Sequence, residues 1–305
     1  MRSDIDVDSH GTRLAVWHYP AEDSTWTTTA GRPCVVMAHG FGGTRDAGLE
    51  PYAERFRAAG ADVLLFDSRG FGDSDGDERQ AVDHRRHRED YRAVVAHART
   101  MPGIDPDRIV LWGTSYSGGH VVAVAAGDPR VAAVIAQGAA MDGPAAVLEM
   151  VRYAGPRQVL RLLGHCVRDL ATALLRRPPH LLPLVGPPGT VAAMTAPGAE
   201  SGFLAIAGPS FRNELRARGI LPILANRPVA RASRLRMPLF LAIASRDNVA
   251  PPSAVEKVAR RVKGPVQVER YDVGHFDLYR GQSYEKCVAA QVEFLTTVAG
   301  ARMAP

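Results

Sequence analysis

Residues 109–119 read IVLWGTSYSGG, and this stretch decides the fold. An apolar run ends at Gly113, a helical pattern begins at residue 117, and Ser115 lies in the turn between them. A nucleophilic serine on such a strained strand-to-helix turn needs small residues close before and after it, because the two backbones nearly touch. The last glycine of the usual G-x-S-x-G pattern is Ser117 here, which is also small. The pattern therefore predicts an exposed, reactive Ser115 hydroxyl.

Further apolar runs flank this stretch on both sides. Residues 4–8 and 12–19 alternate polar and apolar side chains and predict an antiparallel hairpin. The other runs are continuous, as strands of a parallel sheet covered on both faces require; they are 34–38, 61–67, 109–113, 131–136, 238–244 and 266–272. Helical patterns alternate with them at 47–59, 83–100, 117–127, 253–262 and 283–298. This order predicts an α/β fold with a doubly wound, mostly parallel sheet of eight strands.

The helical pattern at 83–100 separates apolar from basic side chains. Its period places Val94, Val95 and Ala98 on one face. The same period places three basic residues largely on other faces, namely Arg85, Arg88 and Arg92.

A second motif, AHGFGG at 38–43, follows the first continuous apolar run. In a nucleophile-elbow enzyme this loop supplies one of the two backbone N–H groups that stabilise an oxyanion, and the residue after the serine supplies the other. We expect these donors to be Phe41 and Tyr116, with Gly40 allowing the backbone to approach a substrate. His39 resembles a catalytic base, but we expect it to hold the loop through hydrogen bonds.

The acid and base follow later strands. Asp247 comes after the run at 238–244, and His275 comes just after the run at 266–272. The order Ser, Asp, His is the one that this fold uses, so we expect Ser115, Asp247 and His275 to form the triad. Asp142, after the preceding strand, is the alternative acid. Asp272 and Asp277 flank the base, and we expect both to be structural.

About a hundred residues separate the apolar run at 131–136 from the next one, which is too long for a crossover. We expect a helical cap at 143–237, inserted into a core formed by residues 1–142 and 238–305, with 144–177 helical. Residues 144–236 hold thirteen arginines and four acids, about +9, so the rest of the chain, which has a net charge of +5, is about −4. Such asymmetry indicates either an acidic partner or an arginine-rich solvated surface.

We expect the cap to form a mostly apolar acyl pocket above Ser115. Arg157, Arg161 and Arg168 fall near one another at helical spacing and predict a basic rim at this pocket. Such a rim would suit an acid-bearing substrate, or a phosphate-bearing carrier such as coenzyme A or an acidic carrier protein. The alternative is that these arginines only keep an apolar helix soluble.

Five motifs together resemble the α/β-hydrolase superfamily: AHGFGG, DSRGFGDSDG at 67–76, GTSYSGG, SRDNVAP and GHFDLY. The resemblance covers about residues 30–298. It implies an α/β-hydrolase fold and a serine, histidine and aspartate triad. The details GTSYSGGH and GHFDLYRG resemble a subgroup that includes hydrolases related to X-prolyl dipeptidyl peptidases and fungal acyltransferases acting on polyketides. Asp67 and Arg69 resemble a structural turn of the family.

The predicted activity is hydrolysis of a carboxylic ester or thioester of a small molecule through an acyl-enzyme. The same triad also suits an acyltransferase or a peptidase or amidase, and a catalytically inactive binding protein on this fold is a third possibility. A serine at the turn argues against dehalogenase or epoxide hydrolase chemistry. We expect no metal and no cofactor.

Composition sets further expectations. The chain has 305 residues, 46% hydrophobic and 23% charged, which suits one large globular domain. We see no secretory signal and no apolar run long enough to span a membrane. Three cysteines match no metal site or disulfide framework, so a cytoplasmic location is expected. No nucleic-acid motif accompanies the basic segment. The sequence carries no signal for an oligomeric state.

Overall fold

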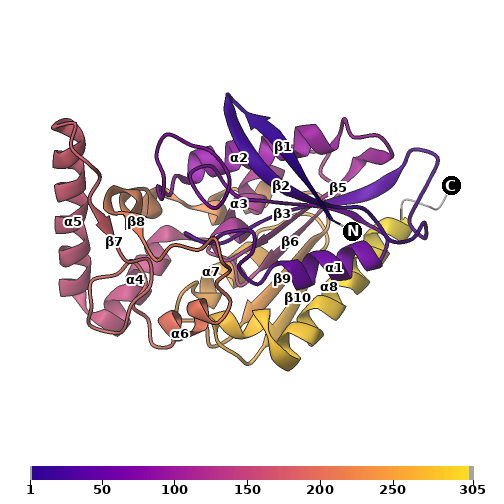
Figure 1. The fold of residues 1–305 in the computed structure, drawn as a ribbon. Helices are drawn as coiled ribbons and strands as arrows, with labels where there is room; N and C mark the ends of the chain where they lie inside the picture. Colours follow the sequence, from indigo (N-terminus) through magenta and orange to yellow (C-terminus); the bar gives the residue numbers. More distant parts are fainter. Residues whose placement is uncertain (1, 302–305) are drawn as a thin grey trace.

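The computed structural model describes residues 2–301 and contains an eight-stranded sheet (Figure 1). Along the sheet the strands follow the order β1-β2-β4-β3-β5-β6-β9-β10. Their bounds are β1 Ser3–Ser9, β2 Thr12–Tyr19, β3 Arg32–Ala38, β4 Asp62–Phe66, β5 Ile104–Thr114, β6 Ala133–Gln137, β9 Leu239–Ala244 and β10 Val266–Tyr271. The strands from β4 to β10 pair in parallel, whereas β2 pairs antiparallel with β1 and β4. The predicted mostly parallel sheet of eight strands is confirmed.

Helices cover both faces of the sheet. One apolar core includes side chains of α1 (Glu50–Ala58) and α8 (Gly281–Ala301), such as Phe56 and Val288. The other includes side chains of α2 (His84–Ala98), α3 (Tyr116–Ala125) and α7 (Pro252–Ala259), such as Val94 and Val121. The central strands are buried on both sides, which explains why their sequences read as continuous apolar runs.

The segment between β6 and β9 lies outside the large sheet. It contains α4 (Gly143–Ala154), α5 (Pro156–Leu174), α6 (Ala199–Leu204), the short strands β7 (Leu181–Leu182) and β8 (Leu215–Arg216), and the 3-10 helices η1 (Ala217–Ala225), η2 (Pro228–Ala230) and η3 (Ala232–Arg234). A further 3-10 helix, η4 (His275–Tyr279), follows β10. In Figure 1, α5 stands at the end of the molecule farthest from α8. We call residues 143–237 the inserted segment; whether it acts as a cap stays a prediction.

Residues 144–177 are mostly helical, as expected. They form two helices rather than one, because Gly155 adopts a left-handed φ of 77° and Pro156 starts a new helix. The helical period of α2 is confirmed for Val94, Val95 and Ala98, which are buried. Arg88 lies on another face of α2, as expected, yet it is only 9% exposed, because the inserted segment covers that side of the helix.

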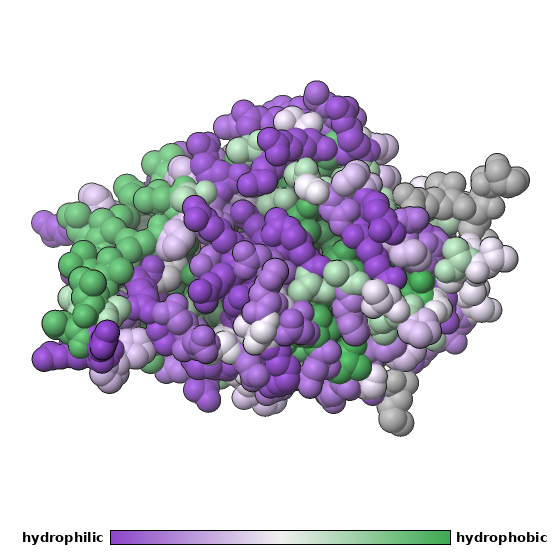
Figure 2. Space-filling view, turned by 90° about the horizontal axis from the view of Figure 1, so that it is seen from above, coloured by the Kyte–Doolittle hydropathy of each residue, from purple (hydrophilic) through white to green (hydrophobic). Residues whose placement is uncertain are grey.

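The helix α5 carries a stripe of exposed apolar side chains. Its large side chains recur at three- and four-residue spacing, so they form one stripe along the helix, namely Leu160, Leu163, Val167, Leu170 and Leu174. Figure 2 shows apolar surface gathered at the end of the molecule that α5 forms in Figure 1. None of the helices in residues 2–301 is both long and apolar enough to cross a membrane.

Buried histidines lie between α2, α3 and the sheet. Burial lowers the pKa of His39 and His87 to about 4. Both imidazoles are therefore neutral in the folded protein at pH 7. Their pKa in an unfolded chain is about 6.5. Below that pH the unfolded chain takes up protons that the folded chain does not, so acid favours unfolding.

We predict that the free energy of unfolding falls as the pH drops from about 6.5 to 4, by up to about 1.4 kcal/mol per pH unit for each of these two histidines. Urea unfolding, followed by tryptophan fluorescence at several pH values, measures this slope. The variant His87→Leu should show a shallower slope, whereas His10→Gln, at an exposed position, should keep the parent slope. An unchanged slope in His87→Leu would show that the lowered pKa of His87 does not contribute to the acid sensitivity.

Candidate active site

Ser115 occupies a sharp turn between β5 and α3. Its φ of 54° and ψ of −119° lie in a region that non-glycine residues rarely adopt. The turn brings two backbones together: a Cβ on Gly113 would lie 2.4 Å from the Ser117 carbonyl oxygen, and one on Gly118 would lie 2.6 Å from the Cβ of Ala139. These contacts explain why both positions are glycine.

The hydroxyl of Ser117 holds this turn in place. It donates to the carbonyl oxygen of Ala38, at the end of β3, over 2.8 Å, and it accepts from the backbone N–H of Thr114 over 2.9 Å. A glycine, the usual residue of the pattern, has no hydroxyl to make these bonds. The departure from the pattern therefore adds a link between the turn and the neighbouring strand.

The structure brings the three predicted residues together. The Ser115 Oγ lies 3.0 Å from Nε2 of His275, and Nδ1 of the same imidazole lies 2.5 Å from Oδ2 of Asp247. All three are at least nine-tenths buried, since their exposed fractions are 9%, 4% and 7% for Ser115, His275 and Asp247. A carboxylate on Nδ1 keeps that nitrogen protonated, which leaves Nε2 free to accept the serine proton.

The Asp247 carboxylate is oriented by its own loop. Its Oδ1 accepts hydrogen bonds from the backbone N–H groups of Val249, over 2.8 Å, and Ala250, over 2.7 Å. The second oxygen is therefore directed at His275. The alternative acid, Asp142, forms an ion pair with Arg227 at 2.8 Å instead. The structure places Asp247, and not Asp142, against the imidazole.

The two predicted oxyanion donors flank Ser115. Tyr116 follows it as the first residue of α3, and Gly40 approaches so closely that a Cβ there would lie 2.9 Å from the Cβ of Ser115. The rings of Phe41 and Tyr116 pack edge to face, with centroids 5.3 Å apart. In the described part of the chain, neither backbone N–H of these two residues has a hydrogen-bond acceptor. Both amides are therefore available to a ligand.

His39 supports the loop that carries Phe41. Its Nδ1 bonds to the Gly40 carbonyl oxygen over 2.8 Å, and its Nε2 accepts from the Ser68 N–H over 3.1 Å. Because Nε2 accepts, Nδ1 carries the proton. The imidazole is neutral and fully engaged in backbone contacts, as expected for a structural residue.

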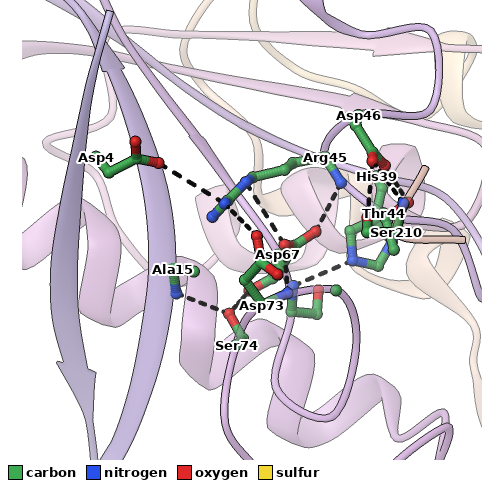
Figure 3. A network of polar contacts seen from close by, with 12 residues as sticks. Asp4, Ala15, His39, Thr44, Arg45, Asp46, Asp67, Asp73, Ser74 and Ser210 are labelled. Carbon is green, nitrogen blue, oxygen red and sulfur yellow. Dashed lines mark hydrogen bonds and ion pairs between the residues drawn. The ribbon is translucent and has the colours of Figure 1, made fainter. Parts of the chain in front are cut away.

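A polar network continues from this loop to the turn after β4 (Figure 3). Asp67 accepts from the backbone N–H groups of Arg45, over 2.6 Å, and Asp73, over 3.1 Å. Its burial raises the pKa of Asp67 to about 6, although the neighbouring Arg45 opposes that shift. The network ties the loop at 39–46 to the sheet edge, so Asp67 has the structural place that its motif indicated.

Two cavities meet at Ser115. A small one, of about 30 Å³, lies on the side of His39, His275 and Tyr279. A larger one, of about 180 Å³, lies under α4, α5 and η1 and is lined mainly by apolar side chains, including Met150, Leu162 and Ile223. We call the larger one the acyl cavity. Ser115, Phe41 and Met194 line both.

Arg157 and Arg161 are not among the residues that line either cavity. Both side chains are exposed, and Arg161 donates to the Gly189 carbonyl oxygen over 3.4 Å. The predicted basic rim is therefore not formed by this pair at the cavity wall. The sequence interpretation missed Met194, which lines both cavities, and Asn226, which is buried in the wall of the acyl cavity. Neither residue lies in a recognisable motif.

Among the described residues, no group of His, Cys, Asp or Glu side chains is placed to hold a metal ion. The three cysteines, Cys34, Cys166 and Cys287, are free and buried. Burial raises the pKa of Cys166 and Cys287 to about 11, so both are uncharged thiols at neutral pH.

The strand order and the strand–turn–helix at Ser115 are those of an α/β hydrolase, and comparison with known proteins agrees. The structure superposes on that of DcsB in complex with its substrate analogue with a TM-score of 0.84, at 22% identity, covering 98% of this chain and 100% of that chain. It superposes on the α/β hydrolase GrgF from a Penicillium species with a TM-score of 0.82, at 26% identity, covering 98% and 99%.

Residues 29–275 match the family described as serine aminopeptidase, S33, and the chain belongs to this family of α/β hydrolases. The quorum-quenching protein AidA of Acinetobacter baumannii is 38% identical over 297 residues, 97% of this chain and 94% of that protein. The thiohydrolase aneE of Aspergillus aculeatus is 30% identical over 291 residues, 90% of this chain and 88% of that protein.

We predict that Asp247→Asn lowers kcat by about 10⁴-fold, because an amide in this place favours the wrong imidazole tautomer. The matched substitution Asp142→Asn removes a carboxylate of equal charge that pairs only with Arg227, so its effect should be far smaller. Turnover of an ester by both purified variants, with circular dichroism as the folding control, decides between them. A larger loss in Asp142→Asn would reverse the assignment of the acid.

Proposed function

We propose that this protein is a serine hydrolase that cleaves a carboxylic ester or thioester of a small organic molecule through an acyl-enzyme. The observation that carries the proposal is the hydrogen-bonded chain from Asp247 through His275 to the strained Ser115. Membership of a hydrolase family supports the same conclusion.

In the first half of the reaction, the Ser115 Oγ attacks the acyl carbon and its proton passes to Nε2 of His275. The negative charge on the carbonyl oxygen is stabilised by the backbone N–H groups of Phe41 and Tyr116; one such donor contributes roughly 3 kcal/mol. Asp247 stabilises the imidazolium. The imidazolium then returns the proton to the leaving oxygen or sulfur, the bond to the leaving group breaks, and the acyl group remains on Ser115.

In the second half, water enters on the leaving-group side and loses a proton to Nε2 of His275 as its oxygen attacks the acyl-enzyme. The tetrahedral oxyanion forms in the same place, and its collapse returns the proton to Ser115 and releases a carboxylic acid. The reaction consumes one water for each ester or thioester cleaved.

The acyl cavity supports an apolar acyl group as the part of the substrate bound beside Ser115. Its lining is mostly aliphatic and it lies beside Ser115 under α4 and α5, as suits an apolar group. The similarity to a relative named thiohydrolase supports a thioester, and the similarity to a quorum-quenching protein supports a small signalling molecule. A panel of p-nitrophenyl esters, acyl thioesters and lactones tests these classes side by side.

Acyl transfer is the second candidate. A relative named polyketide transferase grgF is 31% identical over 191 residues, and transferases use the same acyl-enzyme with an alcohol or amine in place of water. The two activities differ only in the nucleophile that reaches the acyl-enzyme. Product analysis with and without added alcohols or amines separates them, as it separates either from peptidase activity on peptide amides.

We predict that Ser115→Ala lowers kcat by about 10⁶-fold and abolishes labelling by a fluorophosphonate probe, because no other group at the turn can form the acyl-enzyme. Ser117→Ala, two residues away, should keep the labelling. Unchanged turnover in folded Ser115→Ala would refute the triad, and a parent protein that neither turns over the panel nor reacts with the probe would indicate an inactive binding protein.

We predict that Ala146→Phe shortens the longest acyl chain accepted, because the new ring fills the acyl cavity that Ala146 lines. The measurement is kcat/KM for a series of p-nitrophenyl esters whose acyl chains run from about two to about twelve carbons. Only the long esters should suffer. Equal losses for acetate and for long esters would show that the acyl chain binds elsewhere.

A further inference from the structure

A second large pocket lies between the start of α2 and the end of η1. Its volume is about 450 Å³. Arginine dominates its lining, which consists of His84, Arg85, Arg88, Glu89, Arg92, Ala225, Arg227 and Arg231. We call it the arginine pocket. Its residues come from two segments far apart in the sequence, so no motif marks it.

Most of the positive charge in this pocket is not neutralised. In the described part of the chain, Arg85, Arg92 and Arg231 form no ion pair, whereas Arg227 pairs with Asp142. Glu89 is the acid among the lining residues, and its carboxylate lies 3.9 Å from Arg69, outside the pocket lining. Arg85 also stands in the first turn of α2, where the helix dipole disfavours a cation. An anion in the pocket would relieve this repulsion.

The strongest sign of a ligand is Arg88. Its side chain lines the pocket although the residue is only 9% exposed. One guanidinium nitrogen donates to the side-chain oxygen of Asn226, but Nε has no partner. Burial, together with the charges of Arg231, Arg92 and Arg85, lowers the pKa of Arg88 to about 10. A buried guanidinium with an unsatisfied N–H is unfavourable unless an acceptor binds it.

The arginine pocket shares a wall with the acyl cavity. Asn226, which accepts the hydrogen bond from Arg88, is buried and lines the acyl cavity. Asp142 lines the acyl cavity while its partner Arg227 lines the arginine pocket. Leu224 lines one cavity and its neighbour Ala225 lines the other. Residues 224–227 therefore lie between the two cavities, and a substrate bound at Ser115 would have to pass this segment to reach the arginines.

We propose that the arginine pocket binds an anionic group, a phosphate or a carboxylate, carried by the substrate at the end remote from the bond that Ser115 attacks. This inference rests on the proposed function, because it names the chemistry of that substrate. Guanidinium groups suit such an anion, since each offers paired N–H donors to two oxygens. The anion has two possible sources: the phosphate of a carrier such as coenzyme A, or a carboxylate at the far end of the acyl chain.

The first experiment measures binding without turnover. Coenzyme A, inorganic pyrophosphate and adipate are titrated into Ser115→Ala protein by calorimetry at low salt. When Arg92→Glu and Arg231→Glu are introduced together into the Ser115→Ala protein, the affinity for the preferred anion should fall by about tenfold or more. In the Ser115→Ala protein itself, added salt should also weaken this binding. Both side chains are exposed, so folding should survive. The matched control is Arg157→Glu with Arg161→Glu, the same charge change on α5 outside both cavities.

Equal losses in the two double variants would overturn the proposal, because the effect would then come from the net charge rather than from the pocket. Absence of binding by all three anions would overturn it as well. Since this experiment uses inactive protein, its result does not depend on whether Ser115 hydrolyses an ester. A failure of the pocket is therefore distinguished from a failure of the proposed function, which the fluorophosphonate probe tests.

The second experiment identifies the source of the anion. The kcat/KM values of a neutral p-nitrophenyl ester, the p-nitrophenyl half ester of a dicarboxylic acid and an acyl coenzyme A are compared in active protein. The readout is the kcat/KM of each anionic substrate divided by the kcat/KM of the neutral ester. Arg92→Glu with Arg231→Glu should lower that ratio about tenfold for the half ester or for the thioester, which names the source. An unchanged ratio for both would refute a role of the pocket in substrate binding.

Discussion

The structure depends on the close approach of β5 and α3 around Ser115. The turn holds a non-glycine residue in a left-handed φ, and contacts on three sides keep it there. Ser115 donates its N–H to Gln137 at the end of β6, and its carbonyl oxygen accepts from Ala140. The Ser117 hydroxyl reaches the end of β3. A strained serine persists only when its surroundings impose the conformation, and here two neighbouring strands do so.

The parallel sheet then determines where the other reactive groups meet. Parallel strands have their carboxyl ends at one edge, so the loops after β3, β5, β9 and β10 converge on Ser115. The loop after β9 also supplies two N–H groups to Asp247, which hold its carboxylate in place beside His275. Buried polar groups around the site, such as His39 and Asp67, form hydrogen bonds with the backbone at this edge of the sheet.

The inserted segment supplies the surroundings of the site rather than its chemistry. Its helices α4 and α5 line the acyl cavity, and the residues after η1 bring Arg227 and Arg231 to α2. The arginines of this segment differ in whether they pair with the core. Arg216 and Arg218 both pair with Glu78 on the core, whereas Arg157 and Arg161 stay on the surface. Substrate preference is therefore expected to depend on this segment.

The sequence by itself determined the elbow, the order of the three reactive residues and the parallel sheet, because these depend on local spacing and on continuous apolar runs. Only the tertiary structure decided which carboxylate meets His275, since both Asp247 and Asp142 follow strands. It also buried Arg88, which the helical period had placed away from the apolar face. A period reports which face of a helix is apolar, but not which distant segment covers the remaining faces. The arginine pocket forms where such a distant segment covers α2, and its two halves lie about 140 residues apart in the sequence.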